Sequence, residues 1–221
     1  MSKSIEKIVT LNKLSGRGYD ELGNVRSFTD KEFFDISCEM ALNQTNPDYC
    51  RLFEGLADWV KNALRVSTAL EIGSGPGYLL NCLNKLNIDC AGIDGNPFSK
   101  AFFDENHPEF AEKYFIDKFF EKDYAPVDTL LSIEVFEHIP DEGLINILTK
   151  VKNELKPKFI VFSSTPFADP NPGWDLQWGH INLKTPAEWQ ELFNSFGYRL
   201  HAAKPPVTEW ASLYADQTIL N

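Results

Sequence analysis

The sequence lacks the features that mark secreted, membrane-spanning and zinc-binding proteins. No apolar run approaches the roughly 20 residues that cross a bilayer, and residues 1–7 contain no apolar signal core. The four cysteines form no Cys-x-x-Cys pair, which argues against zinc and dithiol redox motifs. We therefore expect a reduced, cytoplasmic protein with no membrane segment.

Positive charge is also scarce. Only five of the 21 basic residues are arginine, and the formal net charge is −11. Because phosphate contacts dominate nucleic-acid affinity, a chain with no basic run is a poor partner for long RNA or DNA, although a nucleotide end stays open. We interpret the acidity mainly as a contribution to solubility.

The hydrophobic pattern predicts one α/β domain with a helical cap. At 221 residues, the chain can bury one sizeable core and a small accessory segment. Residues 1–66 contain two amphipathic helical patterns and no chemical motif, which indicates either packing on the sheet edge or a lid over a ligand. From Thr68 onward, apolar strands alternate with helical segments, as in a mostly parallel sheet covered on both faces. We predict a cap over residues 1–66 and a core over residues 67–221.

Five parallel strands and a closing antiparallel hairpin account for a seven-stranded sheet. The expected strands cover residues 68–72, 89–93, 114–119 with the exit loop, 127–133 and 158–163, and the hairpin covers residues 198–203 and 209–215. Thr185 is expected to cap a helix that ends at Gly197. The connection before that helix, residues 167–184, is expected to be a long loop without secondary structure, which is typical of a functional segment.

The most informative stretch lies at the end of the first expected strand. Glu71 precedes three glycines at alternate positions, Gly73, Gly75 and Gly77, and a helical pattern follows. Glycine is needed where the backbone takes positive φ or approaches a ligand closely, and a helix start presents free N–H groups to an anionic part of that ligand. A dinucleotide fingerprint would require glycine at the position of Tyr78. The stretch therefore predicts a strand, a tight turn and a helix, and Tyr78 argues against a dinucleotide. A nucleotide site and a purely structural turn stay open.

An acidic residue also ends the second expected strand. Asp94 follows the glycines by about 20 residues, the position whose carboxylate binds ribose hydroxyls in this sheet topology. The alternative is an ordinary aspartate in an Asp-Gly turn, since Gly95 follows it.

A second group of polar residues follows the fourth expected strand. If the chain turns helically there, Glu134, Glu137 and His138 share one face at spacings of three and four. That face would lie at the carboxyl edge of the sheet, where open α/β folds bind their ligands. The long loop adds His180.

The glycine stretch resembles motif I of the class I methyltransferases that depend on S-adenosylmethionine (SAM). With Asp94, the Glu-Val-Phe-Glu-His-Ile-Pro segment from Glu134, the Ser-Thr-Pro after the fifth strand, and His180, the resemblance covers residues 67–203. The subgroup that it resembles contains the ubiquinone-pathway catechol O-methyltransferases and related small-molecule and sugar enzymes. The resemblance implies a Rossmann-like fold, SAM as methyl donor, and transfer to a hydroxyl oxygen of a small aromatic or sugar-like acceptor.

The resemblance also implies a set of donor-binding residues. Asp117 and Phe119 would lie near the adenine, at the end of the third strand. The complete implied set is Glu71, Gly73, Gly75, Gly77, Asp94, Asp117, Phe119 and Glu134.

The same resemblance implies a metal site. The ubiquinone-pathway enzymes and the small-RNA 3′-terminal ribose methyltransferases share an acid-x-x-Glu-His element and a later histidine that bind a divalent cation. The corresponding residues are Glu134, Glu137, His138 and His180. Two carboxylates and two imidazoles suit Mg²⁺, Mn²⁺ or Fe²⁺, and such a cation lowers the pKa of a bound hydroxyl.

Several alternatives stay open from the sequence. The acid–histidine segment is a metal site, a metal-free site in which His138 or His180 removes the acceptor's proton, or a structural element. Trp174 and Trp178 either contact the acceptor or pack the loop. For the whole chain, the alternatives are an NAD(P)-dependent oxidoreductase on a similar sheet and a SAM-binding protein without catalysis.

Overall fold

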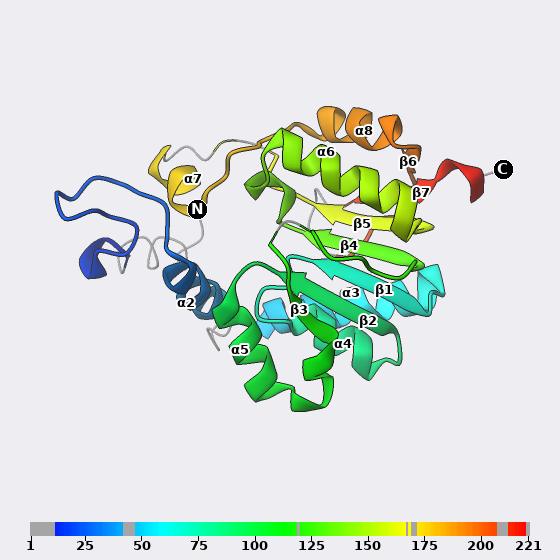
Figure 1. Ribbon diagram of the computed structural model, residues 1–221, viewed down its shortest axis with the longest axis horizontal. Helices are drawn as coiled ribbons and strands as arrows, with labels where there is room; N and C mark the ends of the chain where they lie inside the picture. Colours follow the sequence, from blue (N-terminus) through cyan, green and yellow to red (C-terminus); the bar gives the residue numbers. More distant parts are fainter. Residues whose placement is uncertain are drawn as a thin grey trace.

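A seven-stranded sheet forms the centre of the computed structural model, which describes residues 12–41, 47–118, 120–166, 168, 172–206 and 212–219 (Figure 1). The strand order is β3-β2-β1-β4-β5-β7-β6, and β7 alone runs antiparallel to its neighbours within the described sheet. The strands are β1 Thr68–Ile72, β2 Asp89–Asp94, β3 Tyr114–Ile116, β4 Thr129–Ile133, β5 Phe159–Ser163, β6 Tyr198–Leu200 and β7 Ser212–Asp216. The predicted α/β, Rossmann-like fold is confirmed.

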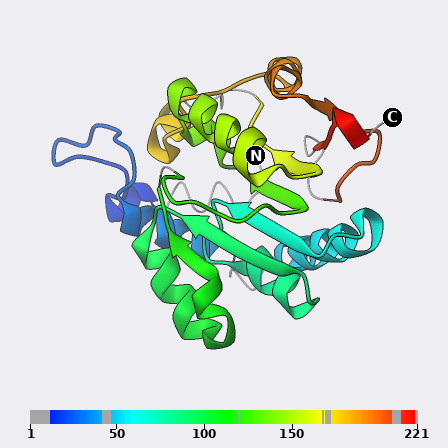
Figure 2. The same cartoon turned by 45° about the vertical axis from the view of Figure 1, so that its right-hand side comes forward.

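Helices cover both faces of this sheet because neighbouring residues of its central strands point to opposite sides. In β4, for example, Leu130 belongs to the core that β4 shares with α6 and α8, whereas Leu131 belongs to the core shared with α3 and α4. Figure 2 separates the two layers, with α6 in yellow-green on one side and α3 and α4 in cyan on the other. The helices are α2 Asp30–Ala41, α3 Pro47–Trp59, α4 Tyr78–Lys85, α5 Pro97–Asn106, α6 Asp141–Lys150, α7 Pro172–Trp178 and α8 Pro186–Ser195. Within the described ranges, no helix is long and apolar enough to cross a membrane.

The connection before α8 differs from the expectation. Residues 167–184 were expected to lack secondary structure, but they include the helix α7. A helix of seven residues is not stable by itself, so its stability comes from tertiary contacts. The backbone N–H of Phe28 donates to the carbonyl oxygen of Gln177, and the Gln177 side chain donates to the carbonyl oxygen of Gly18. These long-range contacts could not be inferred from the local sequence.

The N-terminal helix α2 lies beside the loops that follow the central strands. The Asn96 side chain donates to the backbone oxygen of Asp30 at 2.7 Å, and the Phe34 ring contacts Phe102 of α5 at a centroid distance of 5.7 Å. Figure 1 shows α2 and α7 close to each other at one end of the molecule. Both elements therefore stand where the sheet presents its ligand-binding edge.

Candidate active site

The glycine loop between β1 and α4 has the backbone conformation that its sequence predicts. Gly73, Gly75 and Gly77 have φ values of 72°, 50° and 82°. A Cβ at Gly73 would lie 2.3 Å from Val135, and one at Gly77 would lie 2.1 Å from Phe103, so packing requires glycine at both positions. A Cβ at Gly75 would meet no atom within 4 Å. The first and third glycines thus close the loop against the core, and the middle one leaves its backbone open to a ligand.

Glu71 ends β1 with a carboxylate that is only partly satisfied. The side chain is buried, and burial raises the pKa of Glu71 to about 8. Its Oε2 atom has no hydrogen-bond partner within the described structure. A buried carboxylate oxygen without a partner destabilises the fold unless a ligand supplies a donor or a cation.

Asp94, at the end of β2, is joined directly to the glycine loop. Its Oδ2 accepts a hydrogen bond of 2.8 Å from the Gly75 N–H, and its Oδ1 accepts one of 2.7 Å from the Asn96 N–H. Burial raises the pKa of Asp94, although these amides act in the opposite direction. The glycine loop and Asp94, the residue predicted to bind the ribose, thus form one hydrogen-bonded unit.

The carboxylate of Asp117 accepts its hydrogen bonds within its own loop. Its two carboxylate oxygens accept hydrogen bonds from the Glu121 N–H, the Lys122 N–H and the Tyr124 hydroxyl, at 2.8, 2.9 and 2.8 Å. Phe119, the other residue expected near an adenine, lies outside the described residues.

The segment after β4 departs from the expected helical turn. Glu134 has a φ of 55°, in the left-handed region, and only Phe136–His138 form a short 3-10 helix. The Glu134 N–H donates to the Ser163 carbonyl oxygen at 3.0 Å, which extends the pairing of β4 with β5 by one residue before the chain turns. The prediction of one helical face was therefore wrong, because sheet pairing continues through Glu134.

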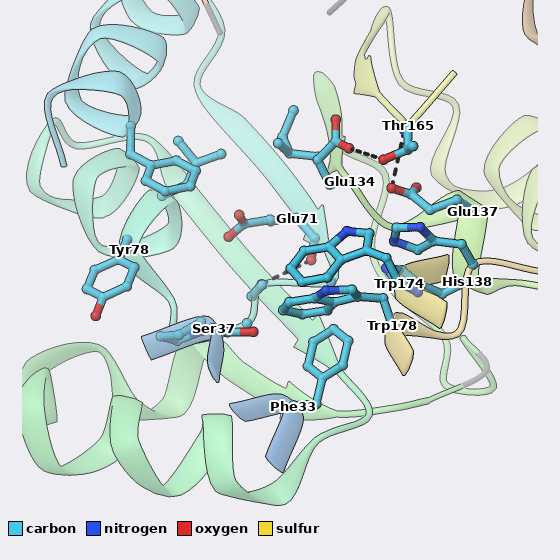
Figure 3. A pocket seen from close by; sticks show the side chains of 18 residues that line it. Phe33, Ser37, Glu71, Tyr78, Glu134, Glu137, His138, Thr165, Trp174 and Trp178 are labelled. Carbon is cyan, nitrogen blue, oxygen red and sulfur yellow. Dashed lines mark hydrogen bonds between the residues drawn. The ribbon is translucent and has the colours of Figure 1, made fainter. Parts of the chain in front are cut away.

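Thr165 nevertheless brings the two glutamates together. Its hydroxyl donates to Glu134 Oε2 at 3.1 Å, and its backbone N–H donates to Glu137 Oε1 at 3.3 Å (Figure 3). Glu137 is fully buried, and its burial together with the nearby Glu134 carboxylate raises the pKa of Glu137 to about 8. One oxygen of each glutamate, Oε1 of Glu134 and Oε2 of Glu137, has no partner within the described structure.

Glu137 also fixes the chain that carries His180. Its carbonyl oxygen accepts hydrogen bonds from the N–H groups of Ile181 and Asn182, both at 2.9 Å. As a result the His138 and His180 rings lie 4.9 Å apart between centroids. Glu137, His138 and His180 each offer a ligand atom, and these atoms lie within 4.8 Å of one another.

The two histidines have different surroundings. Burial, reinforced by His180, lowers the pKa of His138 to about 4, so its ring is neutral at neutral pH. His180 Nδ1 lies 2.7 Å from Asp175 Oδ1, which leaves Nε2 for a ligand or a proton. Three of the four expected metal ligands are therefore assembled as a group that could hold a cation, whereas Glu134 is not in that group.

A single cavity of about 310 Å³ joins the glycine loop to the acid–histidine group (Figure 3). Its lining includes Glu71, Gly73 and Gly75 at one end and all four expected metal ligands at the other. Asp94, Asp117 and Gly77 are not among the lining residues. The sequence did not identify nine other lining residues as functional: Phe33, Ser37, Phe53, Ser74, Pro76, Tyr78, Leu79, Ile133 and Thr165. Thr165 had been noted only within the Ser-Thr-Pro motif, and the two phenylalanines follow an amphipathic pattern that also fits ordinary packing.

Aromatic side chains from two distant segments close the end of this cavity that holds the acid–histidine group. The Trp178 ring contacts Phe28, Phe33 and Trp174 at centroid distances of 5.4, 4.9 and 5.6 Å. Phe33 also contacts the His138 ring at 5.8 Å. Both tryptophans line the cavity and also pack against neighbouring rings, so contact with an acceptor stays a prediction.

Residues 42–203 match the family described as the methyltransferase domain. The chain belongs to this family. The predicted class I SAM-dependent methyltransferase is confirmed at the level of family and fold, and the oxidoreductase alternative is not favoured. No curated protein sequence matches the chain.

Solved methyltransferase structures share this fold at low sequence identity. The methyltransferase domain of the bacterial protein CtHen1-CN is 18% identical with a TM-score of 0.56, and the match covers 76% of this chain and 98% of that chain. A putative O-methyltransferase from Nostoc punctiforme is 18% identical with a TM-score of 0.61, covering 97% and 70% of the two chains. Human N-acetylserotonin methyltransferase, solved in complex with SAM, is 15% identical with a TM-score of 0.57, covering 85% and 56%. These identities support the common fold alone.

Proposed function

We propose that this methyltransferase transfers the methyl group of SAM to a hydroxyl oxygen of a small acceptor, with a divalent cation at the acid–histidine group. The single observation that carries the proposal is the continuous cavity between the glycine loop and the group formed by Glu137, His138 and His180. A donor bound at the loop would direct its methyl group toward an acceptor at that group. Holding two reactants in line contributes up to about 10 kcal/mol to lowering a barrier.

The donor end offers suitable partners for SAM. The unpartnered Oε2 of Glu71 would accept a hydrogen bond from the donor's ammonium group, and Gly75 allows close backbone approach. Asp94 retains lone pairs for the ribose hydroxyls after accepting its two backbone N–H groups. Gly73, Gly77, Asp117, Phe119 and Glu134 complete the proposed donor site.

The acid–histidine group has the composition of a cation site. Glu137 Oε2 is buried without a partner, and the neutral His138 ring is the protonation state that binds a metal. One carboxylate with two imidazoles favours Mn²⁺ or Fe²⁺ over Mg²⁺, which prefers an all-oxygen set. Glu134, held by Thr165 beside Glu137, would add a fourth ligand. When bound, the cation would lower the pKa of an acceptor hydroxyl.

The residues of the chain also serve the acceptor directly. Without a bound cation, His138 or His180 would take the hydroxyl proton as the methyl group is transferred, because an imidazole nitrogen that ligates a cation cannot also accept a proton. Asp175 fixes the orientation of the His180 ring through Nδ1. From the proposed cap of residues 1–66, Phe33 and Phe53 contribute to the cavity wall, which supports the lid interpretation.

A chelator experiment tests the cation and the chemistry together. The purified protein would be incubated with labelled SAM and a panel of small hydroxylated acceptors, before and after dialysis against chelator, with Mn²⁺, Fe²⁺ or Mg²⁺ added back. We expect chelator to abolish transfer and Mn²⁺ or Fe²⁺ to restore it. Undiminished turnover in chelator would contradict the role of the cation and would leave proton removal by a histidine as the mechanism.

Calorimetry tests the donor separately. S-adenosylhomocysteine, the demethylated product of SAM, is expected to bind, and NAD is not. NAD binding without any signal from S-adenosylhomocysteine would contradict the proposed function.

A further inference from the structure

The charge balance of the cavity carries information about the acceptor. Of the eighteen described residues that line it, none is lysine or arginine, whereas Glu71, Glu134 and Glu137 are acidic. If the proposed function holds, SAM, with a net charge of +1, and one divalent cation would together offset three carboxylates. No positive charge would then remain for a negatively charged group on the acceptor.

Three basic residues near the cavity in sequence are already paired with acids. Arg17 and Arg26 form salt bridges of 2.7 Å with Glu39 and Glu32, both on α2. Lys184, which follows the segment of His180, pairs with an aspartate of α6 at 2.7 Å. A buried anion is stable only when it is paired, so these residues offer no ready partner to an anionic acceptor.

The wall beside the acid–histidine group is aromatic. Figure 3 shows the indole rings of Trp174 and Trp178 side by side, with the Phe33 ring next to Trp178 and His138 close by. The indole N–H of Trp178 is buried and has no hydrogen-bond partner within the described structure. This wall presents flat apolar faces and one free donor.

We propose that the acceptor subsite selects an uncharged hydroxylated ring and rejects the same ring when it carries a carboxylate or a phosphate. The face of the ring lies on the Trp178 side of the cavity, and its hydroxyl groups face Glu137, His138 and His180. Aromatic and sugar rings share this chemistry, because both present an apolar face and hydroxyl groups. This inference rests on the proposed function and specifies its acceptor.

Matched pairs of ligands test the charge selection in two arms. The protein, loaded with S-adenosylhomocysteine and Mn²⁺, is titrated by calorimetry with a catechol that carries a hydroxymethyl group and with the same catechol carrying a carboxylate. In the sugar arm, a methyl glucoside is compared with the corresponding glucuronide. In at least one arm we expect the uncharged ring to bind about tenfold or more tightly than its anionic counterpart.

The outcomes distinguish this inference from the proposed function. The charge selection is overturned if the anionic ring binds as tightly as the uncharged ring, or more tightly, in the arm that shows binding. It is also overturned if neither uncharged ring binds. In both cases, binding of S-adenosylhomocysteine would show that the donor site is intact. Failure to bind S-adenosylhomocysteine counts against the proposed function instead.

Two variants test the residues behind the selection. Trp178→Ala is expected to weaken binding of the uncharged ring roughly 3- to 10-fold and to leave S-adenosylhomocysteine binding unchanged. Leu176→Ala, on the same helix and 51% exposed outside the cavity lining, is the matched control and is expected to have no effect. Ser37→Lys adds a cation to the cavity wall and is expected to narrow the difference between the uncharged and anionic rings. An unchanged ratio in Ser37→Lys, or equal effects of the Trp178 and Leu176 variants, contradicts the proposal.

Discussion

The two ends of the cavity are built in different ways. The donor end uses consecutive pieces of chain at the ends of β1 and β2, and its glycine loop is tied to Asp94 and closed against Phe103. The acceptor end combines side chains from α2, the loops after β4 and β5, and α7. The donor end is thus determined by local sequence on a rigid sheet, whereas the acceptor end exists only when distant segments meet. Substitutions at the acceptor end could therefore change which acceptor binds while binding of the same donor is retained.

The sharpest way to separate the two ends is to remove a histidine from the acceptor end. His180→Ala is expected to lower kcat/KM by roughly 10²–10⁴-fold, because the site would lose a cation ligand or, without a cation, a proton acceptor. Binding of S-adenosylhomocysteine should change by less than about twofold, because His180 stands at the far end of the cavity. Methyl transfer from labelled SAM and calorimetry measure the two effects.

His201→Ala is the matched control for that experiment. His201 lies beside β7, where its backbone N–H donates to the Leu213 carbonyl oxygen, and it does not line the cavity. Equal losses of activity in the two histidine variants would mean that the loss at His180 reflects general damage to the fold.

Two alanine substitutions compare packing with ligand access inside the donor end. Gly77→Ala would force a Cβ to within 2.1 Å of Phe103 and is expected to destabilise the fold by about 2–5 kcal/mol. Gly75→Ala meets no atom within 4 Å, so it should cost only about 1–2 kcal/mol and should act mainly on donor binding. Chemical unfolding and calorimetry with S-adenosylhomocysteine distinguish these effects. Equal destabilisation by both substitutions would contradict the assignment of Gly75 to the ligand side.

The pH dependence of stability tests the buried acid of the donor end. The pKa of Glu71 is raised to about 8 in the fold from an ordinary value of 4.5, so the folded state holds this proton more tightly than the unfolded state. Its contribution to stability is therefore lost as pH rises from about 4.5 through about 8. Glu71→Gln removes this loss. The difference in free energy of unfolding between the variant and the natural protein should therefore rise in favour of the variant by roughly 1 kcal/mol for each pH unit in that window.

Glu71→Gln is also expected to weaken binding of S-adenosylhomocysteine about tenfold, because a charge-assisted hydrogen bond is lost. Glu105→Gln, on the exposed surface of α5, is the control substitution. A stability difference that stays constant with pH would show that Glu71 is not the titrating group.

The smallest expected effect lies in the contact between the N-terminal segment and α7. Ser27 Oγ donates to the Leu176 carbonyl oxygen at 2.9 Å in an exposed position. Ser27→Ala should therefore weaken the closure of the acceptor end by no more than about 1 kcal/mol, raising the KM of the acceptor a few-fold without changing donor binding. Ser195→Ala removes a hydroxyl that bonds only within α8 and serves as control. A larger change in donor affinity than in acceptor KM would contradict this assignment.

The same contrast explains how much the sequence could predict. Strand β1 was predicted with its observed bounds, because an apolar run followed by spaced glycines has few structural alternatives. The positive φ values of the loop followed from the same glycines. Asp94 could be placed beside the loop because parallel strands align their carboxyl ends.

The acceptor end was predicted only in part. Glu137, His138 and His180 were named as candidates, but the left-handed Glu134 could not be foreseen because it results from the hydrogen bond of its N–H to the neighbouring strand. Phe33 has the ordinary pattern of an amphipathic helix, and only the fold brings it against Trp178. Long-range contacts of this kind leave no local signal in one sequence.

The backbone carbonyl of Glu137 has a consequence for how the acid–histidine group would exchange the proposed cation. The N–H groups of Ile181 and Asn182 both donate to this one oxygen. The spacing of His138 and His180 is therefore set by main-chain hydrogen bonds that need no metal. The group is thus preorganised, and a cation that enters has little chain entropy to remove. Metal exchange should then proceed without local unfolding, and the amide protons of Ile181 and Asn182 should exchange slowly with solvent whether or not the cation is bound.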